Sequence, residues 1–140
     1  MTPLIIDSSF YISLVYPQDS NHPQAKKIYR RLIADRYRQI TTEDFLKESL
    51  THLSQRVGRN IAIMFYQELI TNTQVISIAT DYFQQGLKLF LNPKLNKDIS
   101  LVDCIAAVVH KDIANSVVLT FDPHFKSLGC KIYHLIGSNV

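Results

Sequence analysis

The sequence predicts an α/β protein with a largely parallel sheet. Short apolar runs rich in β-branched residues alternate with longer segments whose apolar residues recur at helical spacing. This alternation is typical of a parallel sheet covered by helices. The length of 140 residues is enough for one compact domain with a real hydrophobic core. We therefore expect one domain, residues 1–140, with four or five strands.

The strands are predicted from apolar runs that turn-forming residues bound. The two clearest are residues 3–7 and 117–121, each of which leads directly into an aspartate or ends on it. Three shorter runs indicate further strands: 39–41, 75–78 and 131–133. Five runs at most can form the sheet.

Six segments have helical periodicity: 8–16, 23–37, 42–57, 60–71, 80–91 and 100–112. Several follow a Ser, Thr or Asn that can cap a helix, and Gly58 can end the third. The third and fourth helices flank residues 57–60 and are expected to form an arm that projects from the sheet. Such an arm would be a natural surface for a partner.

The composition is that of a soluble globular protein. Hydrophobic residues make up 46% and charged residues 19% of the chain, and the formal net charge is +3. We find neither a signal peptide nor a run of apolar residues long enough to cross a bilayer. Two cysteines, Cys104 and Cys130, form neither a disulfide framework nor a CxxC metal pair. We expect a cytoplasmic protein with reduced thiols and no membrane contact.

Asp7 and Asp122 occupy equivalent places in the predicted sheet. Each comes at the end of a buried strand, and the carboxyl ends of parallel strands lie at one edge, where open α/β sheets bind ligands. Either residue alone could instead be a helix cap or a turn residue. Their coincidence favours a shared site.

Asp103 is the only charged residue between positions 101 and 109, a helical segment that is apolar almost all round and is therefore expected to be buried. A buried carboxylate needs a partner, and the small residues Ala106 and Ala107 one turn on leave room for an ion. A capping box with Ser100 is the alternative, and both roles can hold together.

The helical periodicity of residues 42–57 does not predict a site position for Glu48, in contrast to the three aspartates. The apolar stripe of its helix consists of Phe45, Leu46, Leu50, Leu53 and Val57. Glu48 lies away from the centre of this stripe, near Asp44 and Thr51, so a helical wheel predicts a solvent-facing glutamate.

Several carboxylates gathered at one site imply a cation. Two like charges about 4 Å apart repel by ~4 kcal/mol at an effective dielectric constant near 20. Oxygen ligands suit Mg²⁺, with Mn²⁺ also possible, and the histidines show no zinc spacing.

Ser9 and Thr120 are candidates to position water or ligands. Residues 26–38 carry six basic side chains that could bind RNA phosphates or could simply form a solvated helix face.

Four motifs together resemble a PIN domain, most closely the VapC-type toxins of bacterial toxin–antitoxin pairs. They are residues 5–9, Thr41 and Thr42 followed by Glu48, residues 98–104, and residues 120–125. The resemblance covers nearly the whole chain and implies a three-layer α/β/α fold with a helical arm.

The resemblance also implies a Mg²⁺-dependent endoribonuclease that hydrolyses RNA by metal-activated water. The acidic residues of the family fall on Asp7, Glu48, Asp103 and Asp122, and its small hydroxyl residue falls on Ser9. It further implies a homodimer that a small antitoxin holds inactive. Pro123 departs from the family pattern, which often has a polar residue there, and would stiffen the loop that carries Asp122.

Three other functions stay open at this stage. The chain could be a housekeeping PIN nuclease in RNA processing, or a PIN-like module that binds RNA or protein without catalysis. A phosphatase or phospho-receiver domain is disfavoured, because the phosphatases want a second Asp where this chain has Ser9. Which RNA would be cut does not follow from the sequence.

Overall fold

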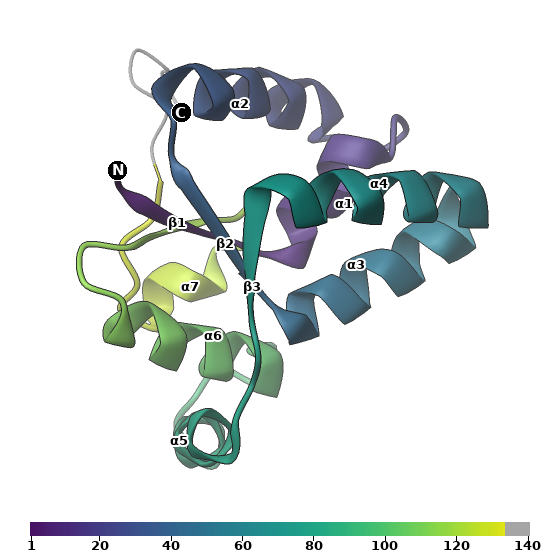
Figure 1. Cartoon of the computed structure of the whole chain (residues 1–140). Helices are drawn as coiled ribbons and strands as arrows, with labels where there is room; N and C mark the ends of the chain where they lie inside the picture. Colours follow the sequence, from purple (N-terminus) through teal and green to yellow (C-terminus); the bar gives the residue numbers. More distant parts are fainter. Residues whose placement is uncertain (134–140) are drawn as a thin grey trace.

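The computed structural model describes residues 1–133 and contains a four-stranded parallel sheet (Figure 1). Its strands are β1 (Pro3–Ile6), β2 (Arg38–Thr42), β3 (Thr73–Ile76) and β4 (Val117–Leu119), in the spatial order β3-β2-β1-β4. The central strand β1 pairs with β2 on one side and with β4 on the other. All four residues of β1 are buried, as its continuous apolar run predicts.

Within residues 1–133, seven helices connect and cover the strands. They are α1 (Ser8–Val15), α2 (His22–Asp35), α3 (Glu43–Arg56), α4 (Arg59–Asn72), α5 (Thr80–Phe90), α6 (Leu101–Asp112) and α7 (His124–Ser127). The six helices predicted from periodicity are confirmed, with ends that differ by one or two residues. Helix α7 was not predicted, because its four residues are too few to show a helical period.

The sheet separates two hydrophobic cores, which makes the fold a three-layer α/β/α arrangement. Successive residues of β1 point to opposite faces, so that Leu4 and Ile6 enter one core and Ile5 enters the other. Helices α1, α2 and α4 contribute to the first core. Helices α6 and α7 cover the opposite face, together with Phe45 from the start of α3 (Figure 1). The α/β/α architecture expected from the sequence is therefore confirmed.

The predicted fifth strand is present only as an isolated parallel bridge between Val118 and Ile132. Two backbone hydrogen bonds hold it, from the Val118 amide to the Lys131 carbonyl at 2.8 Å and from the Tyr133 amide to the Val118 carbonyl at 2.9 Å. The segment therefore extends the edge of the sheet beside β4 without forming a regular strand.

The strand order brings the site residues to one edge. The chain leaves β1 toward β2 and β3 on one side and returns through α5 and α6 to β4 on the other side. The carboxyl ends of β1 and β4 are therefore neighbours at the point where the strand order reverses, which is where open α/β sheets usually bind ligands. Among the described residues, no helix is long and apolar enough to cross a membrane.

Candidate functional site

Asp7 is the N-cap of α1 and is almost completely buried, with 3% of its surface exposed. Its Oδ1 accepts hydrogen bonds from the Ser9 hydroxyl at 2.8 Å and from the Phe10 amide at 3.0 Å, and its Oδ2 accepts one from the Thr120 hydroxyl. The capping role considered from the sequence is therefore real. It coexists with a position at the carboxyl edge of β1.

Burial raises the pKa of Asp7 to about 7, although the three hydrogen bonds favour the carboxylate. The negative charge of Asp103 contributes a further increase. A carboxyl group that is half-protonated near neutral pH and lies beside other acids is poised to bind a cation, which would restore its ionised form.

Ser9 and Thr120 tie the loops after β1 and β4 together. The Ser9 hydroxyl donates to Asp7 and accepts from the Phe121 amide at 3.1 Å. The Thr120 hydroxyl donates to Asp7 and accepts from the Asp122 amide at 2.8 Å. These two hydroxyls thus fix the position of Asp7 relative to the loop that carries Asp122.

Asp103 lies in the first turn of α6 and makes the capping box that the sequence offered as an alternative. Its amide donates to the Ser100 hydroxyl at 3.0 Å, and its carboxylate accepts a long bond of 3.4 Å from the Ser100 amide. The side chain is only partly buried, in contrast to the expectation of a fully buried charge, because it lies at the open end of the helix. Burial and the charge of Asp122 both raise the pKa of Asp103.

Glu48 is exposed, as the helical wheel predicts. Even so, burial of part of its side chain raises the pKa of Glu48, and the charges of Asp103 and Asp44 raise it further. Glu48 therefore lies within electrostatic reach of the acidic site, on the face of α3 that points away from the core. The exposure of Glu48 is therefore compatible with an electrostatic contribution to the acidic site.

Asp103 is the centre of the acidic group. Its charge raises the pKa of Asp7 and of Glu48, and its own pKa is raised by Asp122. Asp103 thus interacts electrostatically with each of the other three predicted carboxylates, which come from three separate segments. Asp7 and Glu48 nevertheless lie outside the tightest cluster.

That tightest cluster consists of Asp103, Asp122 and His124, whose ligand atoms all lie within 4.8 Å of one another. The sequence interpretation did not include His124. A histidine two positions after a strand-end aspartate was the available signal, but it matches no recognised zinc spacing.

His124 is held beside Asp122 by its own backbone. The His124 amide donates to Asp122 Oδ1 at 2.8 Å. Its Nδ1 lies 2.9 Å from the same oxygen, at ion-pair distance, but the direction of approach is not that of a hydrogen bond, and Nδ1 has no hydrogen-bond partner within residues 1–133. The imidazole therefore offers a nitrogen ligand to the acidic cluster.

The donor set fits a divalent cation. Carboxylate oxygens suit Mg²⁺ or Mn²⁺, and one imidazole is compatible with Mn²⁺ and with later transition metals. Four neighbouring carboxylates without a cation would repel one another, and the raised pKa values of Asp7, Glu48 and Asp103 express that repulsion on top of burial. A bound cation would remove it.

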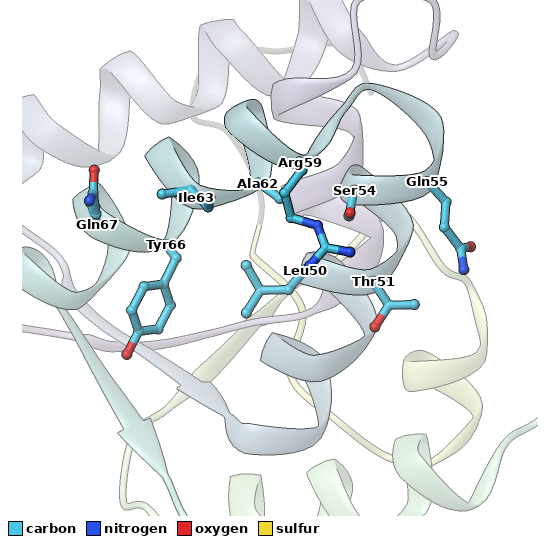
Figure 2. A pocket seen from close by; sticks show the side chains of 9 residues that line it. All are labelled: Leu50, Thr51, Ser54, Gln55, Arg59, Ala62, Ile63, Tyr66 and Gln67. Atoms are coloured by element: carbon cyan, nitrogen blue, oxygen red, sulfur yellow. The ribbon is translucent and has the colours of Figure 1, made fainter.

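A separate hollow of about 510 Å³ lies between α3 and α4, away from this chemistry (Figure 2). Its walls include Leu50, Ile63 and Tyr66, and Arg59 reaches across it toward Thr51 (Figure 2). None of the four carboxylates lines it. It is a feature of the α3–α4 pair and not of the acidic site.

The six basic side chains of residues 26–38 are exposed, and four of them lie along α2, in the layer opposite α6 and α7 (Figure 1). Lys26, Lys27 and Arg30 point to solvent, and Arg31 pairs with Asp35 at 3.1 Å. The α2 surface is therefore not part of the acidic site.

Comparison with known proteins places the fold. No protein-family model and no curated protein sequence matches the chain. The structure of the Mycobacterium tuberculosis toxin VapC20, described as cleaving the sarcin-ricin loop, matches with a TM-score of 0.81 and 23% identity over 94% of this chain and 99% of that one.

Two further structures match at lower similarity. VapBC2 from Rickettsia felis, solved with a DNA fragment from its promoter, has a TM-score of 0.65 and 12% identity over 94% of this chain and 96% of that one. A protein of Pyrobaculum aerophilum has a TM-score of 0.60 and 13% identity over 91% of this chain and 84% of that one. The chain thus has the PIN-like fold of the VapC toxins, as the resemblance in its sequence implies.

Proposed function

We propose that the protein is a Mg²⁺-dependent endoribonuclease and the toxin of a toxin–antitoxin pair. The observation that carries the proposal is the cluster of Asp103, Asp122 and His124 in a VapC-like fold. The electrostatic effect of Asp103 on Asp7 and Glu48 supports it. Mn²⁺ is the second candidate metal, and His124 makes it a serious one.

Asp103 and Asp122 would hold the metal ion together with His124, and Asp7 and Glu48 would complete the acidic environment. The metal, when bound, would activate water and neutralise charge on the phosphate that is attacked. Ser9 and Thr120 keep Asp7 in place, and the capping box keeps Asp103 in place. Positioning by backbone amides and hydroxyls means that the acidic group is organised before substrate arrives.

Cleavage of RNA by the wild type and two variants tests the proposal. The wild type should cut RNA in Mg²⁺ or Mn²⁺. Asp7→Asn and Asp103→Asn should each reduce kcat by at least about 100-fold, since each removes a negative charge that favours binding of the metal, and the metal would activate water and neutralise the phosphate. The first RNA to try is a sarcin-ricin loop hairpin, because VapC20 is described as cutting that loop, with an unstructured RNA beside it.

Asp35→Asn is the matched control, since it removes the same charge from an exposed pair on α2. Equal cleavage by the wild type and both site variants would refute the acidic site. Binding of RNA without cleavage in any metal would favour the alternative of a non-catalytic binding module.

An antitoxin is the proposed protein partner, and α4 supports a partner on the helical arm. Five large apolar residues of α4 are 36–63% exposed: Ile61, Ile63, Met64, Tyr66 and Ile70. An exposed apolar face of this kind usually marks a contact surface. VapBC2 from Rickettsia felis shows that a protein of similar fold occurs with its partner.

Growth of cells that express the protein distinguishes a toxin from a housekeeping nuclease. Expression of the wild type should arrest growth, Asp7→Asn should not, and co-expression of a small neighbouring reading frame should restore growth. Unimpaired growth with full RNA cleavage would favour the RNA-processing alternative. A homodimer is also expected, and light scattering of the purified protein would measure it.

A further inference from the structure

A hollow of about 540 Å³ opens beside the acidic site, on the side of β4. Thr120 and Asp122 line it, so it begins where the acidic cluster ends. The rest of its wall comes from the loop after β4, from α7 and from the segment that bridges to Val118: Phe121, Pro123, Lys126, Cys130, Lys131 and Ile132. The side chains of these six residues have no part in the site described above; only the Phe121 backbone amide, which donates to Ser9, belongs to it.

Two lysines give the hollow a charge opposite to that of the cluster. Lys126 lies on α7 and Lys131 lies at the start of the bridged segment, and both are exposed. Within residues 1–133 neither ammonium group lies within ion-pair distance of a carboxylate, although Asp122 lines the same hollow. Their positive charge is therefore available to a ligand.

The floor of the hollow is apolar. Cys130 is buried, Phe121 and Ile132 are half-buried, and Phe121 stacks on Phe10 with 5.9 Å between ring centroids. The backbone hydrogen bonds at Val118 fix Lys131 against β4, and α7 fixes Lys126. The hollow therefore combines a rigid apolar floor with cationic groups at its rim.

We propose that this hollow binds the nucleotide next to the scissile phosphate of an RNA strand, with Lys126 and Lys131 as its phosphate-binding residues. The inference rests on the proposed ribonuclease function. Because Asp122 borders both the acidic cluster and the hollow, an RNA strand whose scissile phosphate lies at the acidic site can continue past Asp122 into the hollow, where the lysines would meet its next phosphate. The sugar and base have apolar faces that match the floor.

The two lysines of the hollow favour a ligand with phosphate groups over a neutral ligand. The acidic residues alone would repel any polyanion, so a strand held at both places needs the lysines to offset that repulsion. Lysine suits this role because it acts as a point charge on a flexible stem and demands no base identity. The site is thus one that positions the RNA backbone without reading its sequence.

Steady-state cleavage by Lys126→Gln, Lys131→Gln and the double variant tests the role. Each single change should raise KM about fivefold, with kcat within about twofold of the wild type, and Lys→Arg should restore KM. Each lysine removed should also reduce the slope of log KM against log salt by roughly 0.7–1. Lys88→Gln on α5 removes the same charge outside the hollow and should change neither quantity.

Binding without catalysis gives a second readout that separates this inference from the proposed function. In EDTA, fluorescence anisotropy of a labelled single-stranded RNA should show measurable binding by the wild type, at least tenfold weaker binding by the double lysine variant, and no change for Lys88→Gln. Lysine-dependent binding by a protein that cuts no RNA would leave the subsite standing and overturn the nuclease.

Two results would overturn the subsite itself. One is cleavage with an unchanged KM in the double variant, which would leave the nuclease standing. The other is an equal loss of binding in Lys88→Gln and in the double variant, which would show only the effect of net charge. Failure of the wild type to bind RNA at all would also count against the hollow as an RNA site.

Discussion

A buried carboxyl group such as that of Asp7 affects stability as well as chemistry. Burial raises the pKa of Asp7 to about 7 in the folded protein, whereas the unfolded chain keeps the ordinary value of 3.8. Between these two pH values the folded state therefore binds more protons than the unfolded state. The free energy of unfolding therefore falls as pH rises from 3.8 to about 7, and the whole cost of the buried charge is present above pH 7.

Asp7→Asn should stabilise the metal-free protein at pH 8 while it abolishes cleavage. The amide can accept from Ser9 and Phe10 and donate to Thr120, whose hydroxyl can reorient. A rise of the pKa from 3.8 to about 7 corresponds to ~4 kcal/mol as an upper bound, so a gain of about 1–3 kcal/mol is expected. Thermal unfolding in EDTA at pH 8 and pH 5 measures it.

The gain should shrink toward pH 5, where the Asp7 carboxyl of the wild type is protonated. Asp35→Asn on the surface of α2 serves as the comparison and should change the melting temperature little at either pH. A loss of stability in Asp7→Asn that is equal at both pH values would show that the hydrogen bonds outweigh the charge.

His110 is a second residue whose protonation state the fold sets. Its Nδ1 lies 2.8 Å from the Ser116 hydroxyl, which donates to the His110 carbonyl, and its Nε2 accepts from the Lys131 amide at 3.2 Å. Burial, with a smaller contribution from Lys111, lowers the pKa of His110 below 6.5. The neutral ring thus anchors the segment that bridges to β4.

For His110 the sign of the pH effect is opposite to that of Asp7. Below 6.5 the unfolded state binds the proton more readily than the folded state, so the contribution of His110 to stability is complete above that pH and declines below it. His110→Gln should remove this decline. The difference in unfolding free energy between the wild type and His110→Gln, followed from pH 8 to pH 5, isolates it from the effect of Asp7.

At the scale of elements, the contact between α5 and α6 depends on Gly86. A Cβ atom added at Gly86 would lie 2.4 Å from Ile105 Cγ1 and 2.9 Å from Ile105 Cα, on the helix that carries Asp103. The close approach of two helix backbones explains a glycine inside α5, where it costs about 1 kcal/mol of helix propensity. Only glycine allows this packing distance.

Gly86→Ala should destabilise the protein by about 1–3 kcal/mol, despite the better helix propensity of alanine, because the helices must separate. Gln84→Ala on the exposed side of α5 should have little effect. Denaturant unfolding measures both variants. Equal stability of Gly86→Ala and the wild type would mean that α6 can shift freely.

Those parts of the site that were predicted from the sequence depend on local patterns. Asp7 and Asp122 follow from apolar runs that end on an aspartate, since parallel strands share an edge. Asp103 follows from its isolation in an apolar helix. Both patterns are contained within about ten residues, which is why one chain suffices to show them.

The remaining features depend on how elements are placed in space. A helical wheel reports which face of α3 is buried. Glu48 lies on the other face, yet it is within electrostatic reach of Asp103, which comes from a distant part of the sequence. His124 joins the cluster because of the turn at Pro123 and the short helix α7, neither of which has a period. Only the family resemblance pointed to Glu48, and nothing in the sequence interpretation pointed to His124.

For the whole molecule, the acidic site links metal binding to folding. The ligand groups must be deprotonated to bind a cation, and a cation that binds the folded state alone stabilises it, by about 2.7 kcal/mol at a concentration 100 times its Kd. Mg²⁺ or Mn²⁺ should therefore raise the melting temperature, and more so at pH 8 than at pH 6, because the pKa values of Asp7, Glu48 and Asp103 are raised.

Asp103→Asn should remove most of this metal-dependent stabilisation, since Asp103 interacts with each of the other three carboxylates. His124→Ala should weaken the response to Mn²⁺ more than the response to Mg²⁺, because imidazole is a better ligand for Mn²⁺. Thermal unfolding with increasing metal concentration, at both pH values, measures these effects, with Asp35→Asn as the control. An equal metal response in the wild type and in Asp103→Asn would place the cation elsewhere on the molecule, whatever the RNA cleavage assay shows.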